Sequence, residues 1–357
     1  MKSILIVSTE RHTGKSVLSL SIGLSLKDRG ISFCYMKPIS YEVSYKTGEP
    51  IDQDAETIRS ILELNDSVYD IAPVPLEGPF LREAIESGDR GFRQRILSAF
   101  NRMMKDRQIA LIEGRHSLGL GVSAGLSDVD LAQLLSADVL ILSRYDGEET
   151  IDRILCALRL FESGPLILGV IFKEVSMETQ FNLLNDVFVP FLADRGAEVL
   201  GIIPSDLRSR TVSIADILKR LGGTLLTTSS AEQTIGNFLV AAMGPDVAVR
   251  HFRRTPHLAV ITGGDRTELH EIALKTSNLR CLILTGNLHP SREILAKAQE
   301  RGVSVILTGQ NTMAAAVVCE NLLNRAWIRP GEALDHAIDH FRRNIDIDRI
   351  IEKATEH

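Results

Sequence analysis

The chain has 357 residues, more than a single hydrophobic core usually supports, so at least two domains are expected. Hydrophobic residues make up 44% of the sequence and charged residues 24%, which is the balance of a soluble globular protein. The net charge of −6 argues against a general nucleic-acid binder, because such proteins need surplus Lys and Arg to displace counterions.

Neither secretion nor membrane insertion is indicated. No apolar run approaches the roughly 20 residues that cross a bilayer, and the start of the chain becomes polar too quickly for a signal peptide. The cysteines have no paired spacing and each sits in an apolar stretch, which predicts buried, reduced thiols at Cys34, Cys156, Cys281 and Cys319. We therefore expect a cytoplasmic protein with no membrane partner and no nucleic-acid partner.

The first two hundred residues alternate short apolar runs with amphipathic stretches. The runs predict strands at Ser3–Val7, Ser32–Met36, Ile109–Glu113, Val139–Leu142, Leu166–Phe172 and Val199–Ile203. The stretches predict helices at Lys15–Arg29, Ala55–Leu64, Phe92–Lys105, Asp128–Leu135, Glu149–Phe161 and Glu178–Ala193. Continuous apolar strands alternating with helices are typical of a doubly wound parallel sheet. Residues 1–207 are therefore predicted to form an α/β domain.

A second, smaller α/β domain is predicted at residues 208–330. Its strands are expected at Leu225–Thr228, Asn237–Ala241, Leu258–Thr262, Leu282–Thr285 and Val303–Leu307. Helices are expected at Leu269–Lys275, Arg292–Arg301 and Thr312–Leu323, and the basic stretch His251–Arg254 is interpreted as a solvated connector. The charged tail, residues 331–357, has helical patterns and is expected to pack as terminal helices.

The strongest local signal follows the first predicted strand. A loop ending in Gly14-Lys15-Ser16 leads at once into an amphipathic helix, which is the order that phosphate binding requires. Gly14 permits close backbone approach, Lys15 offsets phosphate charge, and the Ser16 hydroxyl can bind Mg²⁺. We predict a purine nucleotide, ATP or another, held by Ser8, Thr9, His12, Thr13, Gly14, Lys15 and Ser16. The alternative is an ordinary helix start with a solvated lysine.

Two carboxylates and a second lysine are candidates to complete this site. Glu113 ends a buried strand and Asp54 begins a predicted helix, so either can serve as a metal-side carboxylate beside Ser16. Lys37 ends another strand, at the edge where α/β sheets place ligands. Each has a plainer alternative: a strand-end carboxylate facing water for Glu113, a helix N-cap for Asp54, and an exposed lysine for Lys37.

With these motifs in place, the first domain resembles dethiobiotin synthetase. The matching stretches are the loop Ser8–Ser16, the strand end Tyr35–Pro38, Asp54 followed by alanine, and Glu113 followed by glycine. The resemblance implies a P-loop NTPase-like fold, ATP with Mg²⁺, metal ligation by Ser16, Asp54 and Glu113, and a homodimer. If the chain is an enzyme of that type, Lys15 and Lys37 would stabilise the transferred phosphoryl group.

Taken whole, the chain resembles the N-terminal regulatory half of long phosphotransacetylases. In those proteins a dethiobiotin-synthetase-like domain precedes a DRTGG domain. The second match rests on Asn237–Met243, Leu258–Thr267, Cys281–Gly286 and Gly302–Thr308. The resemblance covers nearly the whole chain and does not include an acetyltransferase domain.

Two positions depart from the dethiobiotin synthetase pattern. Phe172 stands where the family's asparagine helps to recognise adenine, which leaves base specificity open. The family's substrate loop after Lys-Pro is replaced by Ser40–Tyr45, which gives no support for the biotin precursor as substrate.

The second domain has its own candidate ligand site at Gly264, Asp265, Arg266 and Thr267, between a strand and a helix. Asp265 and Glu268 are spaced like a capping box, and Arg266 could bind a phosphate or carboxylate. A capped helix with an exposed arginine is an equal alternative. Thr-Gly turns at 262–263, 285–286 and 308–309 would form one rim if the sheet is parallel, which favours a site for an unidentified small-molecule effector.

Three functions remain open at this stage. The first is a nucleotide-binding regulatory or sensor protein in which ATP in the first domain is coupled to an effector in the second. The second is an ATP-dependent ligase or synthetase that phosphorylates a carboxylate or carbamate. The third is a scaffold whose site has decayed. We favour the first, because the acetyltransferase part is absent and the base and substrate positions are altered.

Overall fold

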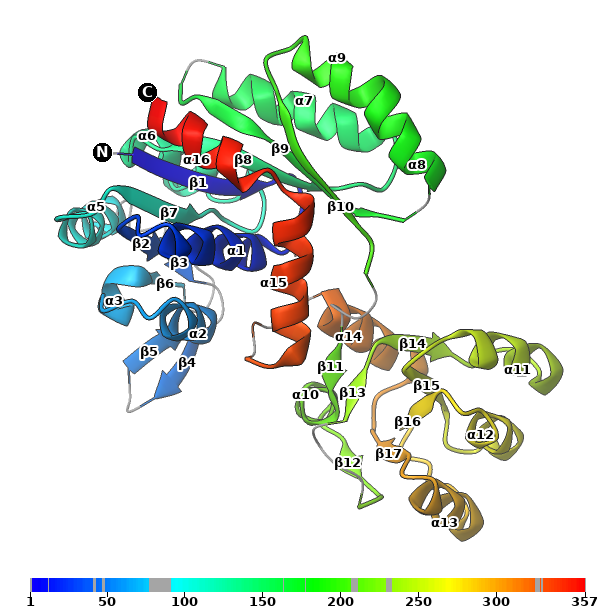
Figure 1. Cartoon of the computed structure of the whole chain (residues 1–357). Helices are drawn as coiled ribbons and strands as arrows, with labels where there is room; N and C mark the ends of the chain where they lie inside the picture. Colours follow the sequence, from blue (N-terminus) through cyan, green and yellow to red (C-terminus); the bar gives the residue numbers. More distant parts are fainter. Residues whose placement is uncertain are drawn as a thin grey trace. The chain divides into compact units, whose positions relative to one another are not determined.

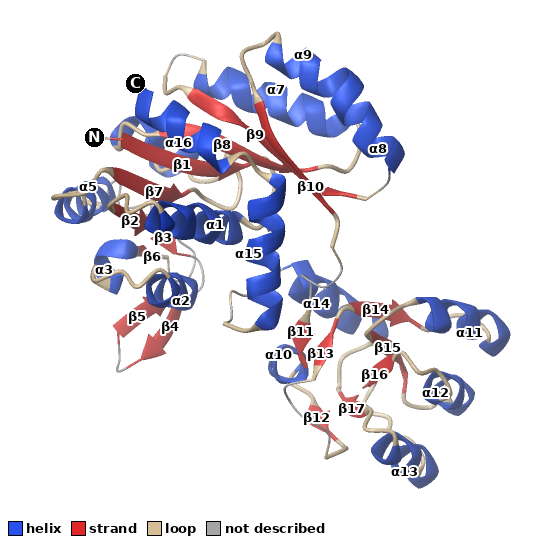
Figure 2. Cartoon of the chain, in the orientation of Figure 1, coloured by secondary structure: helices blue, strands red, loops and turns tan. Residues whose placement is uncertain are grey.

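The computed structural model describes residues 2–11, 13–40, 43–46, 49–76, 91–162, 164–176, 178–206, 211–228, 233–324, 328 and 330–356. The chain divides into two compact α/β units (Figures 1 and 2). Unit 1 comprises Met1–Asp206 together with Trp327–His357, and unit 2 comprises Leu207–Ala326. None of the helices in the described ranges is both long and apolar enough to cross a membrane.

Unit 1 is built on a six-stranded parallel sheet with the order β10-β9-β8-β1-β7-β2. The strands are β1 (Lys2–Ser8), β2 (Phe33–Met36), β7 (Ile109–Glu113), β8 (Asp138–Arg144), β9 (Ile167–Val175) and β10 (Val199–Pro204). Each is a nearly continuous apolar run because helices cover both faces of the sheet (Figure 2). The six predicted strands are confirmed, and so is the doubly wound parallel fold.

The helices before residue 206 also follow the predicted pattern, with additions. They are α1 (Lys15–Asp28), α2 (Gln53–Ile61), α3 (Val68–Ile71), α5 (Phe92–Met103), α6 (Asp128–Leu134), α7 (Glu149–Phe161), α8 (Glu178–Leu183) and α9 (Val189–Ala193). A π-helical turn, Leu184–Phe188, separates α8 from α9, where one helix was predicted. Two small strand pairs were not predicted: β3 (Ile39–Ser40) with β6 (Val74–Pro75), and β4 (Val43–Lys46) with β5 (Glu49–Asp52).

The C-terminal helices, α15 (Glu332–Asn344) and α16 (Ile347–Glu356), pack on unit 1. α15 contacts α1 and β10, and Arg342 of α15 forms a 2.5 Å ion pair with Asp28 at the end of α1. Between the two helices, Ile345 forms an antiparallel bridge with Gly201 of β10. α16 contacts β1, β9 and β10. Residues from both ends of the chain therefore complete the core of unit 1.

Unit 2 is built on a five-stranded sheet with the order β12-β17-β16-β15-β14. Strands β14 (Asn237–Val240), β15 (Leu258–Gly263), β16 (Leu279–Thr285) and β17 (Ser304–Leu307) are parallel, and β12 (Thr224–Leu225) is antiparallel at one edge. The short strands β11 (Val212–Ser213) and β13 (Thr234–Ile235) pair separately. The second α/β domain is confirmed.

Alternate residues of the unit 2 strands enter two apolar layers. Leu258, Val260 and Leu282 face one layer, and Ala259 and Ile261 face the other. The unit 2 helices are α10 (Ile214–Leu221), α11 (Pro245–Arg254), α12 (Thr267–Leu274), α13 (Arg292–Glu300) and α14 (Thr312–Asn324). The connector interpretation of His251–Arg254 is wrong, because this stretch is the last turn of α11 and Phe252 anchors it in the core.

The cysteines correct one more expectation. Cys34, Cys281 and Cys319 are buried, and burial raises the pKa of the Cys34 and Cys319 thiols to about 12. Cys156, however, is exposed on α7. Its neighbours in sequence are apolar, but in a helix adjacent residues face different directions, so position 156 lies outside the buried stripe.

Candidate functional site

The loop between β1 and α1 has a backbone arrangement that suits an anion. β1 ends at Ser8 and α1 begins at Lys15, so the loop leads from a buried parallel strand directly to a helix N-terminus. Gly14 precedes the helix with φ 91°, in the left-handed region, and no side chain caps the first turn. The first N–H groups of α1 therefore lack a side-chain acceptor, and the helix dipole adds positive charge beside them.

Lys15 is buried although it carries an ammonium group. Only 6% of the residue is exposed, and its Nζ donates a 2.8 Å hydrogen bond to Oγ of Ser8. Burial lowers the pKa of Lys15, while nearby carboxylates, Glu113 foremost, act in the opposite direction. A desolvated ammonium beside uncapped helix amides is stabilised when an anion arrives.

The remaining loop residues place further polar atoms at the end of β1. Thr13 Oγ1 is buried and has no hydrogen-bond partner among the described residues. The Thr9 hydroxyl lies 2.7 Å from the hydroxyl of Ser143, at the end of β8. His12, which was predicted to take part, lies outside the described residues. Within the described part of the loop, Thr13 therefore carries a buried hydroxyl that a ligand could satisfy.

Glu113, at the end of β7, connects the loop to β2. Its Oε1 accepts a 2.8 Å hydrogen bond from the Ser16 hydroxyl, and its Oε2 accepts one of 2.8 Å from the Tyr35 hydroxyl. Burial, followed by the charge of Glu113, raises the pKa of Tyr35 well above its usual value, so Tyr35 stays a neutral donor. The water-facing alternative for Glu113 is wrong, since only 6% of the residue is exposed. Tyr35 was not among the predicted site residues, although it lies two positions before Lys37.

Lys37 lies in a cluster of carboxylates. Its Nζ is 2.9 Å from Asp52 Oδ2 and 3.6 Å from Asp54 Oδ2, and the side chain is 9% exposed. Burial by itself lowers the pKa of Lys37, but Asp52, Glu113 and Asp54 outweigh burial and the pKa is raised. The N-cap of α2 is Asp52, whose Oδ1 accepts the N–H of Ala55 at 2.8 Å, and not Asp54. Asp54 follows in the first turn, and its carboxylate faces Lys37.

A further buried acid, Asp128, lies beside the site and was not predicted. It begins α6, is fully buried, and accepts the backbone N–H of Arg115 at 2.7 Å through Oδ1. Burial raises the pKa of Asp128 to about 6, although Arg115 and Lys15 act in the opposite direction. A Cβ on Gly114 would lie 2.8 Å from Asp128 Oδ1, so the glycine after Glu113 is needed for this close approach.

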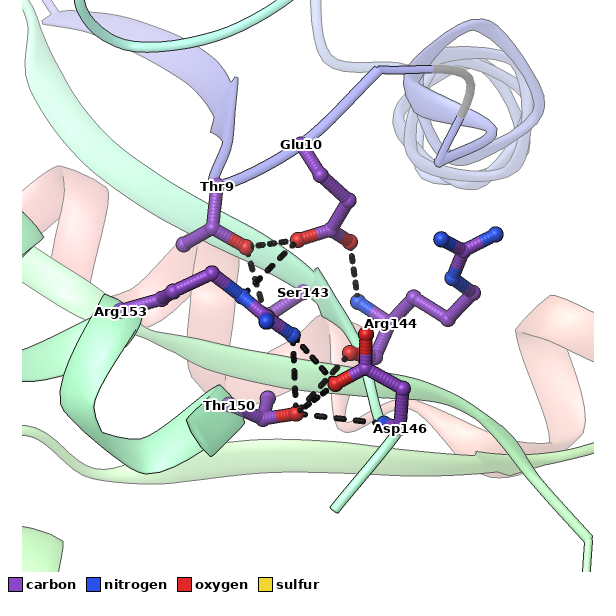
Figure 3. A network of polar contacts seen from close by, with 7 residues as sticks. All are labelled: Thr9, Glu10, Ser143, Arg144, Asp146, Thr150 and Arg153. Atoms are coloured by element: carbon purple, nitrogen blue, oxygen red, sulfur yellow. Dashed lines mark hydrogen bonds and ion pairs between the residues drawn. The ribbon is translucent and has the colours of Figure 1, made fainter. Parts of the chain in front are cut away.

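Figure 3 shows a polar network that holds Glu10, an acidic residue within the loop. One oxygen of Glu10 accepts the N–H of Arg144 at 2.6 Å, and the other lies 3.8 Å from Nε of Arg153. Arg153 also bonds Asp146 at 2.5 Å. A carboxylate at a phosphate loop repels anions, and these contacts fix it at the end of β8. The sequence offered no signal for them, because Glu10 and Arg144 are 134 positions apart.

Phe172 does not face the loop. It is fully buried, and its ring meets the Tyr145 ring edge-on with centroids 6.2 Å apart. Because side chains alternate across a strand, the next residue of β9, Lys173, is the one that reaches the loop: a Cβ on Gly14 would lie 3.3 Å from Lys173 Nζ. At this end of β9, residue 173 is therefore the one whose side chain lies beside the phosphate loop.

The three threonines predicted to form a rim in unit 2 do lie at neighbouring strand ends, but their hydroxyls form hydrogen bonds within the protein. Thr262, Thr285 and Thr308 follow or end the neighbouring parallel strands β15, β16 and β17, and all three are buried. Their hydroxyls donate to the backbone carbonyls of Ala241, Thr262 and Leu221, respectively, at 3.4, 3.2 and 3.1 Å. Thr262 and Thr285 therefore connect neighbouring strand ends, and Thr308 connects the end of β17 to the end of α10.

The predicted ligand residues of unit 2 have mixed placements. Gly264 is packed so closely that a Cβ would lie 1.7 Å from the carbonyl oxygen of Leu288. Asp265, Arg266 and Thr267 are exposed. The capping-box expectation is wrong, since α12 begins at Thr267 with Arg266 as its N-cap and no side-chain cap. The cause is that Asp265 turns back toward Gly263, where its Oδ1 would lie 2.6 Å from an added Cβ.

Metal ligation by protein side chains alone has no support in the described ranges, where no three His, Cys, Asp or Glu side chains are grouped to hold an ion. The hydroxyl of Ser16 and the carboxylate of Glu113 are nevertheless 2.8 Å apart. Oxygen atoms of these two kinds are the ligands that Mg²⁺ accepts together with phosphate oxygens and water.

Family models match both units. The model described as an AAA domain matches residues 2–213, which is more than half of the chain, and the DRTGG domain model matches residues 216–322. The ATP-dependent dethiobiotin synthetase of Methanococcus vannielii is 25% identical over 203 residues, covering 56% of this chain and 92% of that protein. These matches confirm the predicted sequence of domains, a P-loop nucleotide-binding domain followed by a DRTGG domain.

A second kind of relative is longer. The phosphate acetyltransferase of Haemophilus influenzae is 24% identical over 309 residues, which is 77% of this chain but only 41% of that protein. The chain thus spans less than half the length of this relative. Among solved structures, the septum site-determining protein MinD of Pyrococcus horikoshii, complexed with Mg-ADP, has a TM-score of 0.37 and 15% identity, covering 58% of this chain and 83% of that one.

Proposed function

We propose that this chain, which belongs to the AAA domain family, is a regulatory or sensor protein that binds ATP and Mg²⁺ in unit 1 and a small-molecule effector in unit 2. The observation that carries the proposal is the buried ammonium of Lys15 beside the uncapped start of α1. Such a site is electrostatically incomplete without an anion.

Each residue of the loop has a role in this proposal. The N–H groups at the start of α1 bind phosphate oxygens, and the buried Thr13 hydroxyl donates to another. Lys15 leaves Ser8 to contact the terminal phosphates. Gly14 is required because a side chain at φ 91° is strained. The identity of the base stays open, since Phe172 is buried in the core.

Mg²⁺ fits the donor atoms beside the loop. Ser16 and Glu113 would hold the ion, with Asp54 nearby and phosphate oxygens and water completing its shell. The bound ion supplies charge neutralisation for the phosphates. Tyr35 holds the second carboxylate oxygen of Glu113 and fixes its orientation.

The regulatory part of the proposal rests on the longer relative. The match with phosphate acetyltransferase runs over 309 residues and therefore includes both units in one continuous alignment. The aligned part makes up only 41% of that acetyltransferase, which leaves room in the relative for a separate catalytic part and supports a regulatory role for the aligned part. A homodimer, which the dethiobiotin synthetase resemblance implies, and a cytoplasmic location, which the unpaired cysteines favour, complete the proposal.

One observation favours a second candidate function, an ATP-dependent synthetase that phosphorylates a carboxylate or carbamate. Lys37 lies at the ligand edge of the sheet, 2.9 Å from Asp52 and 3.6 Å from Asp54, where its ammonium could orient an acidic substrate or stabilise a transferred phosphoryl group. Release of phosphate during incubation with ATP, Mg²⁺ and a panel of small carboxylic acids separates the two functions. Sustained turnover would favour the synthetase.

Calorimetric titration with ATP and Mg²⁺ tests the proposed binding. Lys15→Ala should weaken the affinity by roughly 100-fold, because a buried charge-assisted contact is lost. Lys27→Ala is the matched control: Lys27 lies on the same helix, is exposed and pairs with Glu63, so the affinity should not change. Equal binding by the wild type and Lys15→Ala, or no binding by the wild type, would overturn the proposal.

A further inference from the structure

Lys173 reaches the phosphate loop from a strand two positions away in the sheet. It lies near the end of β9, and its Nζ and Cε would lie 3.3 and 3.8 Å from a Cβ on Gly14. Its side chain is 17% exposed, and Cζ of Phe341 approaches the same point to 3.5 Å. The ammonium is therefore held against the loop with part of its surface open to solvent.

The strand order places Lys173 opposite the metal side of the site. In the order β10-β9-β8-β1-β7-β2, the strands that carry Glu113 and Lys37 lie on one side of β1 and β9 lies on the other. If the terminal phosphates and Mg²⁺ lie at the β7 side, a nucleotide that crosses β1 would have its nucleoside end toward β8 and β9. Lys173 is then beside the end of the phosphate chain that joins the nucleoside.

The charges around Lys173 favour an exchange of partners. Its Nζ forms a 3.0 Å ion pair with Oε1 of Glu174, whose backbone has φ 63°, in the left-handed region that non-glycine residues rarely adopt. The carboxylate partly offsets an ammonium that already lies beside the positive start of α1. A phosphate oxygen carries charge that can replace that of Glu174.

We propose that Lys173 is a second nucleotide-binding cation, which contacts the phosphate next to the nucleoside and gives up its ion pair with Glu174 on binding. The inference rests on the nucleotide-binding function proposed above. It adds a contact to the phosphate next to the nucleoside, made by a residue that the loop motif alone does not predict. In this position Lys173 contributes equally to ATP and ADP, because both contain the phosphate nearest the nucleoside.

Titrations of two variants with Mg-ATP and Mg-ADP test this placement. Lys173→Met keeps the aliphatic packing against Gly14 but removes the charge. It should therefore weaken the affinity for ATP and the affinity for ADP by the same factor, roughly 10-fold. Glu174→Gln removes the competing carboxylate and should tighten both nucleotides by a few fold. Opposite signs for neighbouring substitutions are not expected from a purely structural role.

Lys353→Met serves as the matched control. Lys353 is also partly buried, at 15% side-chain exposure, and pairs with Glu198 at 3.1 Å, but it lies on α16 and should leave both affinities unchanged. If the wild type binds nucleotide and Lys173→Met binds it equally well, this inference is wrong and the proposed function stands. A loss confined to ATP would overturn the nucleoside-side placement. If the wild type does not bind, the proposed function itself is wrong.

Discussion

In unit 1 the carboxyl edge of the parallel sheet presents side chains whose polar groups face one another around the β1–α1 loop, as Lys15, Ser16 and Glu113 do. In unit 2 the same edge of a parallel sheet presents Thr262, Thr285 and Thr308, whose hydroxyls donate to backbone carbonyls. Both edges show the same pattern in sequence, an apolar strand followed by Thr, Ser or Gly.

The difference shows that a polar strand end is not by itself a ligand site. Ligands of open α/β sheets bind at the carboxyl ends of the strands, so both units have an edge of the right kind. Among the described residues, that edge places a buried ammonium beside an uncapped helix start in unit 1 and not in unit 2. In unit 2 the exposed Asp265, Arg266 and Thr267 remain as candidates for an effector, and the buried Thr262, Thr285 and Thr308 do not.

The glycines of the two edges should respond very differently to alanine. Gly264→Ala in unit 2 puts a Cβ 1.7 Å from the Leu288 carbonyl oxygen, so the backbone must move, and we expect a loss of stability on the order of 4 kcal/mol or more. Gly14→Ala in unit 1 meets only side-chain atoms, at 3.3 Å and beyond, and its cost should be limited to roughly 1–2 kcal/mol from the positive φ. Denaturant unfolding of each variant measures both values.

Gly309→Ala provides the control for this comparison. Gly309 follows β17 at the same edge of unit 2, and no atom lies within 4 Å of its added Cβ. Its stability should change by well under about 1 kcal/mol. A similar loss in Gly309→Ala and Gly264→Ala would show that the edge of unit 2 is sensitive to any substitution, and the contrast with the phosphate loop would lose its meaning.

Local sequence patterns predicted most of the fold because the central strands are continuous apolar runs. Several of the missed elements contain few apolar residues, although α10, which was also missed, buries Ile214, Ile217 and Leu221. α11 buries only Ala248 and Phe252 among many charges, and the pattern of a helix is weak when two buried residues define it. The small pairs β3–β6 and β4–β5 are too short to show any period.

The site residues were predictable where a motif lies at the end of a strand or the start of a helix. Lys15 and Ser16 start a helix, and Glu113 ends a strand, so their roles follow from neighbouring residues in the sequence. The contacts of Asp128 and Lys173 depend on which strands are adjacent in the sheet, and spacing along the chain does not contain that order. The N-cap of α2 was assigned to the wrong aspartate because it depends on the residue at which the helix begins, and the hydrogen bond from the Ala55 N–H identifies Asp52.

Buried ionisable groups in the two units should make stability depend on pH in opposite directions. Burial raises the pKa of Asp128 to about 6, compared with 3.8 when unfolded, so the folded state binds more protons between these values. Stability from this group is therefore lost as pH rises from about 4 to 6. Asp128→Asn does not titrate, so its free energy of unfolding relative to the wild type should increase by about 2 kcal/mol from pH 4 to pH 7. Denaturant titrations across this range measure the change.

His270 should give the opposite trend in unit 2. Burial lowers the pKa of His270 from 6.5, despite its contact with the Gly263 carbonyl, so the unfolded state binds more protons as pH falls below 6.5. Stability from His270 is therefore lost in acid. His270→Gln should be less stable than the wild type at pH 7, and this difference in the free energy of unfolding should shrink as the pH falls to 5. If the stabilities of the Asp128 and His270 variants, relative to the wild type, changed in the same direction with pH, the opposite pKa shifts of these two buried groups would be contradicted.

The smallest expected effect concerns the hydroxyl groups on which the comparison is based. Thr285→Val removes the 3.2 Å bond to the Thr262 carbonyl and the 2.8 Å contact with the Thr312 hydroxyl, so unit 2 should lose about 1 kcal/mol of stability. Ser16→Ala should change stability by less, since Glu113 keeps its bond from Tyr35, but it should weaken binding of ATP when Mg²⁺ is present. Denaturant unfolding measures the stability of both variants, and calorimetric titration measures the affinity of Ser16→Ala for ATP with Mg²⁺. If Ser16→Ala lost stability without any change in Mg²⁺-dependent affinity, its hydroxyl would serve the fold as Thr285 does, and the two edges would not differ in kind.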